Sequence, residues 1–168
     1  THWQHPSFFA YFNANNSDPS VLAEMLTATL GAQCISWQTS PAATELEERV
    51  MTWLVQMLGL LSGFTGVMQD TASTATLCAL LSARETHSAQ AINRAGFVGQ
   101  APAVRYRVYC SEQAHSSVER AAKIAGFGAE NLVKLPVDHT YAMRPSALET
   151  AIRAHFERGL QPPAVVAA

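Results

Sequence analysis

The stretch that bears most directly on the fold is Gln69-Asp70-Thr71-Ala72-Ser73-Thr74-Ala75-Thr76. A short apolar run at 66–68 precedes it and predicts a strand, and the Ala/Leu-rich segment that follows predicts a long helix from about 73 to 95. Such a turn points free backbone N–H groups and the positive end of a helix dipole at one place, which is a seat for an anion such as phosphate. Taken alone, the local pattern favours a simpler role, in which Asp70, Thr71 or Ser73 only caps the helix.

Helical and extended segments alternate along the rest of the chain. Further helices are predicted at 17–31, 40–58, 114–125 and 146–158, and further strands at 104–110, 132–137 and 163–168, with an extended stretch at 34–37. Two of these four helices have a proline near their expected start, at Pro19 and Pro41, and each of the four is closed by a glycine. The alternation predicts an α/β fold in which helices flank a mostly parallel sheet.

The ends of the chain suggest how it is organised. Residues 1–16 form a lead-in rich in Thr, His, Trp and Pro, and residues 17–168 carry the strand–helix alternation. Because an apolar strand at 163–168 is the last predicted element, we expect the chain to be truncated there and to be a segment of a longer protein.

Composition excludes several kinds of protein. The 168 residues are 48% hydrophobic and 14% charged, with a net charge of −2 and a pI near 6.3, so nothing favours binding to nucleic acid or to an anionic membrane. No apolar run is long enough to span a membrane. An odd number of widely spaced cysteines (Cys34, Cys78 and Cys110) indicates reduced thiols and a cytoplasmic setting. His2 and His5 have the spacing of a metal-binding pair but lack a second pair of ligands, which argues against zinc.

A second polar segment, 111–117, follows the predicted strand at 104–110 and opens the next helix. In a parallel sheet this segment and the turn at 71–73 lie at the same carboxyl edge, where ligands bind in such folds. His115 would then project over a ligand whose anionic group occupies the turn; alternatively, it is a helix-start residue bonded to a neighbouring carbonyl. The motifs G-x-x-x-x-G-K-[ST], G-x-G-x-x-G and G-x-S-x-G are missing, so a nucleotide P-loop, a dinucleotide fold and a hydrolase elbow are disfavoured.

The lead-in is unusually aromatic, with the sequence THWQHPSFFAYF at 1–12. Packing against a partner subunit is the simpler interpretation. The alternative is that these rings form the wall of a pocket for an aromatic ligand.

Four motifs in collinear order resemble the group II pyridoxal-phosphate-dependent decarboxylases, and most closely the aromatic-L-amino-acid decarboxylase branch. They are THWQHPSFFAYF at 1–12, SPAATELE at 40–47, DTASTATL at 70–77 and SEQAHSSVERA at 111–121. The resemblance implies the aspartate-aminotransferase-like fold (fold type I) of the pyridoxal-phosphate-dependent transferases, with this chain as part of the large domain. It also implies a homodimer with pockets at the subunit interface and pyridoxal 5'-phosphate as cofactor. The expected reaction is decarboxylation of an L-amino acid, with an aromatic side chain expected, to the amine and carbon dioxide.

The resemblance also assigns roles to residues. It implies that Thr71, Ala72 and Ser73 hold the cofactor phosphate and that the catalytic His115 stacks on the pyridine ring near the reacting carboxylate. Lead-in residues would line the substrate pocket, and the segment from Met25 to Trp37 would contribute to the subunit interface. The pocket residues are Trp3, Tyr11 and Phe12.

Two groups that the resemblance requires are missing from their expected contexts. Neither Lys123 nor Lys134 lies in the His-Lys context of the lysine that binds the cofactor, and no aspartate (Asp18, Asp70 or Asp138) follows the His-x-Asp pattern of the pyridine partner. We therefore expect both groups beyond Ala168. Two alternatives stay open: a catalytically silent fragment or paralogue that acts as a dimerisation module, and an aromatic aldehyde synthase with the same cofactor.

Overall fold

A computed structural model of the chain describes residues 2–11, 16–88, 91–97 and 105–167. Contacts divide the chain into two compact units, Thr1–Val67 and Met68–Ala168. The expected boundary between 16 and 17 falls beside residues that lie outside the described part, and it stays a prediction.

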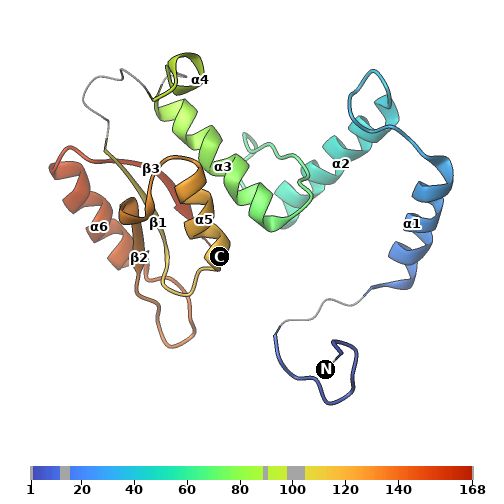
Figure 1. The fold of residues 1–168 in the computed structure, drawn as a ribbon, viewed down its shortest axis with the longest axis horizontal. Helices are drawn as coiled ribbons and strands as arrows, with labels where there is room; N and C mark the ends of the chain where they lie inside the picture. Colours follow the sequence, from blue (N-terminus) through green and yellow to red (C-terminus); the bar gives the residue numbers. More distant parts are fainter. Residues whose placement is uncertain (1, 12–15, 89–90, 98–104, 168) are drawn as a thin grey trace. The chain divides into compact units, whose positions relative to one another are not determined.

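The second unit is built on a three-stranded parallel sheet (Figure 1). The strands are β1 (Tyr106–Ser111), β2 (Leu132–Leu135) and β3 (Gln161–Val166), in the order β2-β1-β3. Val108 of the central strand pairs with Leu132 on one side and with Ala164 on the other. The predicted parallel sheet and three of the predicted strands are thereby confirmed, with shifted ends.

Helices cover this sheet on two faces. The helices are α3 (Ala72–His87), α4 (Ala91–Ala95), α5 (Ser116–Ile124) and α6 (Pro145–Glu157), with a short 3-10 helix, η1, at Ala129–Asn131. Val108 is buried in a cluster with Leu80 of α3 and Ala122 of α5. The next residue, Tyr109, is also fully buried, and its hydroxyl lies 2.8 Å from Nδ1 of His155 on α6. Since successive strand residues face opposite sides, α3 and α5 lie on one face of β1 and α6 on the other.

The long helix predicted for 73–95 is interrupted. α3 ends at His87 and α4 begins at Ala91. The Glu85 carboxylate accepts hydrogen bonds from Arg84 (2.9 Å) and from the backbone N–H of Asn93 (2.9 Å). In a continuous helix, residues eight apart are separated by about 12 Å along the axis, so this contact requires the chain to turn back.

Two predicted extended segments are wrong. Residues 66–68 form no strand. The described strands pair only with one another, so residues 66–68 have no neighbouring strand with which to form backbone hydrogen bonds. Residues 34–37 form turns, because the Thr39 hydroxyl donates to the carbonyl of Gln33 at 2.7 Å and its N–H donates to that of Ser36 at 3.2 Å.

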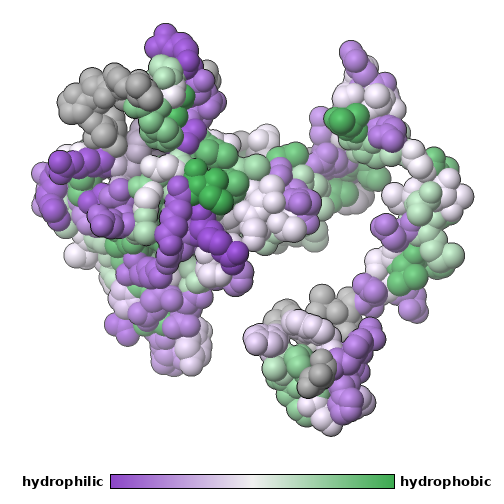
Figure 2. Space-filling view, viewed as in Figure 1, coloured by the Kyte–Doolittle hydropathy of each residue, from purple (hydrophilic) through white to green (hydrophobic). Residues whose placement is uncertain are grey.

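The first unit contains α1 (Asp18–Leu30) and α2 (Pro41–Met57), both predicted from the sequence. Ser17 caps α1 in a capping box with Ser20, and Gly31 ends it with a φ of +57°, a conformation that glycine adopts without strain. Neither helix has a buried residue. Figure 2 shows apolar surface on both helices. The large apolar side chains that they expose include Met25, Leu26, Leu30, Leu46 and Met57. No helix within the described ranges combines the length and the apolarity needed to cross a bilayer.

The bond between Tyr109 and His155 predicts a pH effect on stability. Burial lowers the pKa of His155 below its ordinary value of 6.5, and the neighbouring Arg107 and Arg158 act in the same direction; burial also raises the pKa of Tyr109. The unfolded chain therefore binds the proton more tightly than the folded chain does. Stability should be unaffected by this group above about pH 6.5 and should fall as the pH drops from there towards the folded pKa of His155.

The measurement is the thermal unfolding midpoint of the full-length protein between about pH 7.5 and about pH 5, a range that spans the ordinary histidine pKa of about 6.5. His155→Gln keeps a hydrogen-bond acceptor for Tyr109 but cannot titrate, so its midpoint should fall less over this range. Equal slopes in the two proteins would rule out His155 as the source of the effect.

Candidate functional site

The first part of the site is the N-terminus of α3. Thr71 is its N-cap: the Thr71 hydroxyl accepts the N–H of Thr74 at 3.2 Å, and the Thr71 N–H donates to the Asp70 carboxylate at 2.9 Å. Within the described part of the chain, no acceptor is bonded to the backbone N–H groups of Ala72 and Ser73. A helix cap and an anion seat are therefore compatible here, because the cap by Thr71 leaves the first two N–H groups of the helix open.

The second part is the start of α5, which follows the carboxyl end of β1. His115 is the N-cap of this helix. Its Nδ1 accepts the backbone N–H of Ser117 at 3.2 Å and lies 2.9 Å from the Ser117 hydroxyl. The ring is thus bonded to Ser117. The helix-start alternative expected a bond to a neighbouring carbonyl, which the ring does not make to any described residue. His115 is exposed, whereas Ser117 is only 7% exposed.

The two parts meet in one hollow. Its lining comes from the first turns of α3 and from the facing side of α5, namely Ser73, Thr74, Leu77, Ser117, Arg120, Ala121 and Ile124. The sequence predicted that the turn at 71–73 and the segment 111–117 lie at the same edge, and in the structure Ser73 and Ser117 line the same hollow. The other predicted residues of these two segments, Thr71, Ala72 and His115, are not among the lining residues. The volume is about 210 Å³, less than the roughly 300–1,000 Å³ of most small-molecule sites. Further walls are needed to enclose a whole cofactor.

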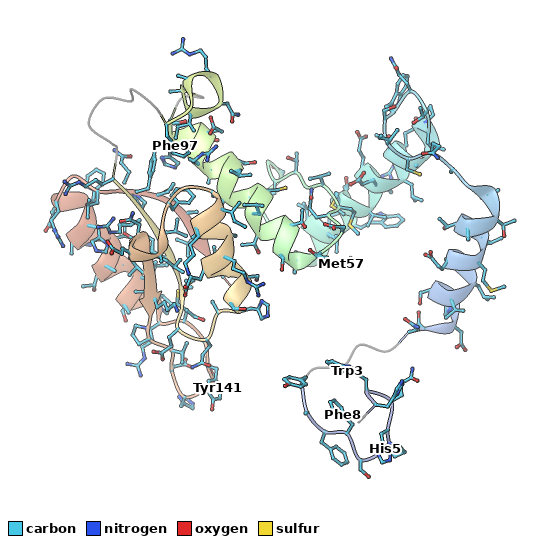
Figure 3. The ribbon with its side chains drawn as sticks, in the orientation of Figure 1. Trp3, His5, Phe8, Met57, Phe97 and Tyr141 are labelled. Carbon is cyan, nitrogen blue, oxygen red and sulfur yellow. The ribbon has the colours of Figure 1, made fainter. Side chains whose placement is uncertain are left out.

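Lead-in aromatic residues form a separate cluster in the first unit. The Trp3 ring lies 5.5 Å from that of Phe8 (both labelled in Figure 3). It lies 5.7 Å from the ring of Tyr11. Trp3 and Tyr11 therefore lie together, and both are largely exposed; their role in a substrate pocket stays a prediction. Phe12, the third predicted pocket residue, lies outside the described residues. Phe8 was given no role from the sequence, although it stands in the same aromatic run.

Both lysines of the chain bind the same carboxylate. Lys123 and Lys134 lie 2.7 Å and 3.1 Å from the two oxygens of Glu119, and hydrogen bonds from Lys123 first and Lys134 second lower the pKa of Glu119. Both lysines are more than half exposed. The Asp138 carboxylate accepts the N–H and hydroxyl of Thr140 and the N–H of Ala142, and these bonds lower its pKa. Glu119 and the two lysines form a cluster of ion pairs on the surface, and Asp138 stabilises a turn. None of these groups lines the hollow.

Two residues that line the hollow were not among the site residues predicted from the sequence. Ser117 and Arg120 lie in the motif at 111–121, but neither residue has a role in the interpretation of the sequence. The available signal was helical spacing: a side chain two positions after an N-cap lies beside the cap, and residues 117, 120, 121 and 124 share one helix face. Among the residues that the structure covers, no group of three or more His, Cys, Asp or Glu side chains is placed to bind a metal ion.

Comparison with known proteins gives one family for the chain. The model of the pyridoxal-dependent decarboxylase conserved domain matches residues 1–168. The chain is 42% identical to a phenylacetaldehyde synthase of Arabidopsis thaliana, with 96% of this chain and 33% of that protein aligned. It is 44% identical to an aromatic-L-amino-acid decarboxylase of Sus scrofa, with 99% and 36% aligned. The crystal structure of Oryza sativa TDC with PLP and tryptamine superposes with a TM-score of 0.78 at 34% identity, over 98% of this chain and 35% of that one. The chain spans about a third of the length of these relatives.

Proposed function

Because the chain belongs to the pyridoxal-dependent decarboxylase family, we propose that it is part of an enzyme that converts an aromatic L-amino acid to its amine and carbon dioxide. In this proposal, residues 17–168 are the N-terminal part of the large domain that binds pyridoxal 5'-phosphate. The observation that carries the proposal is the shared hollow between the N-terminus of α3 and Ser117, the hydrogen-bond partner of His115.

The residues at this edge fit the phosphate of the cofactor. Ala72 and Ser73 have open backbone N–H groups at the positive end of a sixteen-residue helix, and their small side chains leave room for an anion. The Ser73 hydroxyl adds a further donor. Thr71 would contribute mainly by holding the turn, since its hydroxyl and its N–H already have partners.

His115 fits the second task, which is to bind the flat face of the cofactor and the reacting carboxylate. Because Nδ1 accepts from Ser117, a neutral ring carries its proton on Nε2. That N–H would donate to the substrate carboxylate and orient it for loss of carbon dioxide. When bound, pyridoxal phosphate supplies the electron sink that such a reaction needs. The lysine that binds the cofactor and the carboxylate that pairs with its pyridine nitrogen belong to the rest of the protein in this proposal, since Lys123 and Lys134 are paired with Glu119.

The exposed apolar surface of the first unit supports a homodimer. No residue of α1 or α2 is buried, although both carry several large apolar side chains. We propose that the segment from Met25 to Trp37 lies in the subunit interface, and that Trp3, Tyr11 and Phe12 line a pocket for the aromatic side chain of the substrate. Three cysteines without disulfides fit a cytoplasmic location, which is likewise a proposal.

The test is product release by the purified full-length protein with added pyridoxal phosphate. Tyrosine, tryptophan and phenylalanine should each be compared with glutamate and histidine, while amine, carbon dioxide and aldehyde are all measured. We expect equal amounts of amine and carbon dioxide from at least one aromatic substrate. Aldehyde in place of amine would identify an aldehyde synthase, and cofactor binding or dimerisation without any product would identify the silent module.

A further inference from the structure

Ser117 differs from the other hydroxyl residues near the hollow in its burial and in its partner. Its side chain is 7% exposed, while Ser73 and Ser116 are exposed. The Ser117 hydroxyl lies 2.9 Å from Nδ1 of His115, and the Ser117 backbone N–H donates to the same atom at 3.2 Å. One residue therefore contacts one nitrogen of the imidazole through two groups.

The two contacts to Nδ1, the hydroxyl at 2.9 Å and the longer backbone N–H at 3.2 Å, together favour one position for the proton of the neutral ring. A backbone N–H is always a donor, so Nδ1 must present its lone pair, and the Ser117 hydroxyl can then donate to it as well. The proton of the neutral ring is then on Nε2. With Nδ1 held against the helix, the ring can rotate little about its bond to the backbone.

We infer that Ser117 is a positioning residue, whose hydroxyl adds to its own backbone N–H in holding Nδ1 of His115, and so fixes the orientation of the ring and the tautomer with the proton on Nε2. This inference rests on the proposed function of His115. Its physical basis is the one by which a hydrogen bond to one nitrogen of a histidine sets what the other nitrogen can do. Without the hydroxyl, only the longer backbone bond would hold the ring, and more of the molecules would have it misplaced.

The experiment compares Ser117→Ala with Ser116→Ala in the full-length protein. Removing the Ser117 hydroxyl leaves no buried polar group unpaired, since Nδ1 keeps the backbone N–H. We expect kcat to fall about three- to tenfold, the effect of one neutral hydrogen bond, with the dissociation constant of pyridoxal phosphate unchanged. Ser116→Ala should keep the kcat of the unmodified protein, because the Ser116 hydroxyl only accepts from Arg120, at 3.1 Å. Ser117→Thr should restore most of the activity.

A second readout does not depend on turnover. The ¹⁵N chemical shifts of the His115 imidazole, assigned by their loss in His115→Asn, report the tautomer. In the unmodified protein they should show the proton on Nε2, and in Ser117→Ala they should move towards the mixture of a solvated imidazole. Unchanged shifts in Ser117→Ala, or a kcat equal to that of Ser116→Ala, would overturn the inference. If the unmodified protein released no amine, the proposed function would fail, and the shifts alone would still decide the role of Ser117.

Discussion

Replacing His115 by asparagine is expected to lower the turnover of the full-length protein at least 100-fold, and to leave its thermal unfolding midpoint nearly unchanged. The two effects separate because His115 is at once the N-cap of α5 and the candidate catalytic residue. Asparagine is a strong N-cap and can accept the Ser117 N–H, so the helix keeps its start. It has neither an aromatic face for the cofactor nor an imidazole N–H for the carboxylate, and losses of 10²–10⁴ are usual when a group active in proton transfer or orientation is removed.

The measurement is amine release at saturating substrate, with the cofactor content of each preparation determined beforehand. His139→Asn is the matched control, because His139 is an exposed histidine in the turn between β2 and α6. This control should retain full turnover. If His115→Asn also kept near-normal turnover, His115 would be only a helix cap, and the proposed site would lose its catalytic group.

Local signals in the sequence were sufficient wherever a helix carried its own start and stop. Pro19 after Ser17 and Gly31 at the end predicted α1, and Gly126 and Gly159 marked the ends of α5 and α6. The glycines have positive φ angles, which is the conformation that ends a helix. These features depend only on neighbouring residues, so a single sequence contains them.

Features that depend on distant contacts were not predictable. The break after α3 arises from the bond between Glu85 and the N–H of Asn93, which competes with a continuous helix of favourable composition. Residues 66–68 have the composition of a strand, but a strand forms only beside another one. At the candidate site, the sequence indicated which segments meet, whereas the pairing of Ser117 with His115 required the coordinates.

The phosphate seat gives the last and most selective prediction. Replacing Ser73 by aspartate is expected to weaken the binding of pyridoxal phosphate to the full-length protein about 100-fold. A carboxylate about 4 Å from one phosphate charge costs between about 1 kcal/mol in water and about 4 kcal/mol near a protein surface, and a 100-fold loss is about 2.8 kcal/mol. The same carboxylate in the first turn of α3 interacts favourably with the helix dipole, by about 0.3–1 kcal/mol. The cofactor-free variant should therefore be at least as stable as the unmodified protein.

Two further variants make the result specific to the site. Ala79→Asp adds the same charge to an exposed position of α3 that does not line the hollow, and it should leave the dissociation constant unchanged. Ser73→Ala keeps the backbone N–H and removes only the hydroxyl, so its loss should be about three- to tenfold. Titration of the cofactor-free proteins with pyridoxal phosphate gives all three constants. An unchanged constant in Ser73→Asp would mean that the phosphate binds elsewhere, because an added negative charge among its donors cannot be neutral. The loss in Ser73→Asp should exceed the loss in Ser73→Ala, because the added carboxylate repels the phosphate whereas alanine removes only one hydroxyl donor.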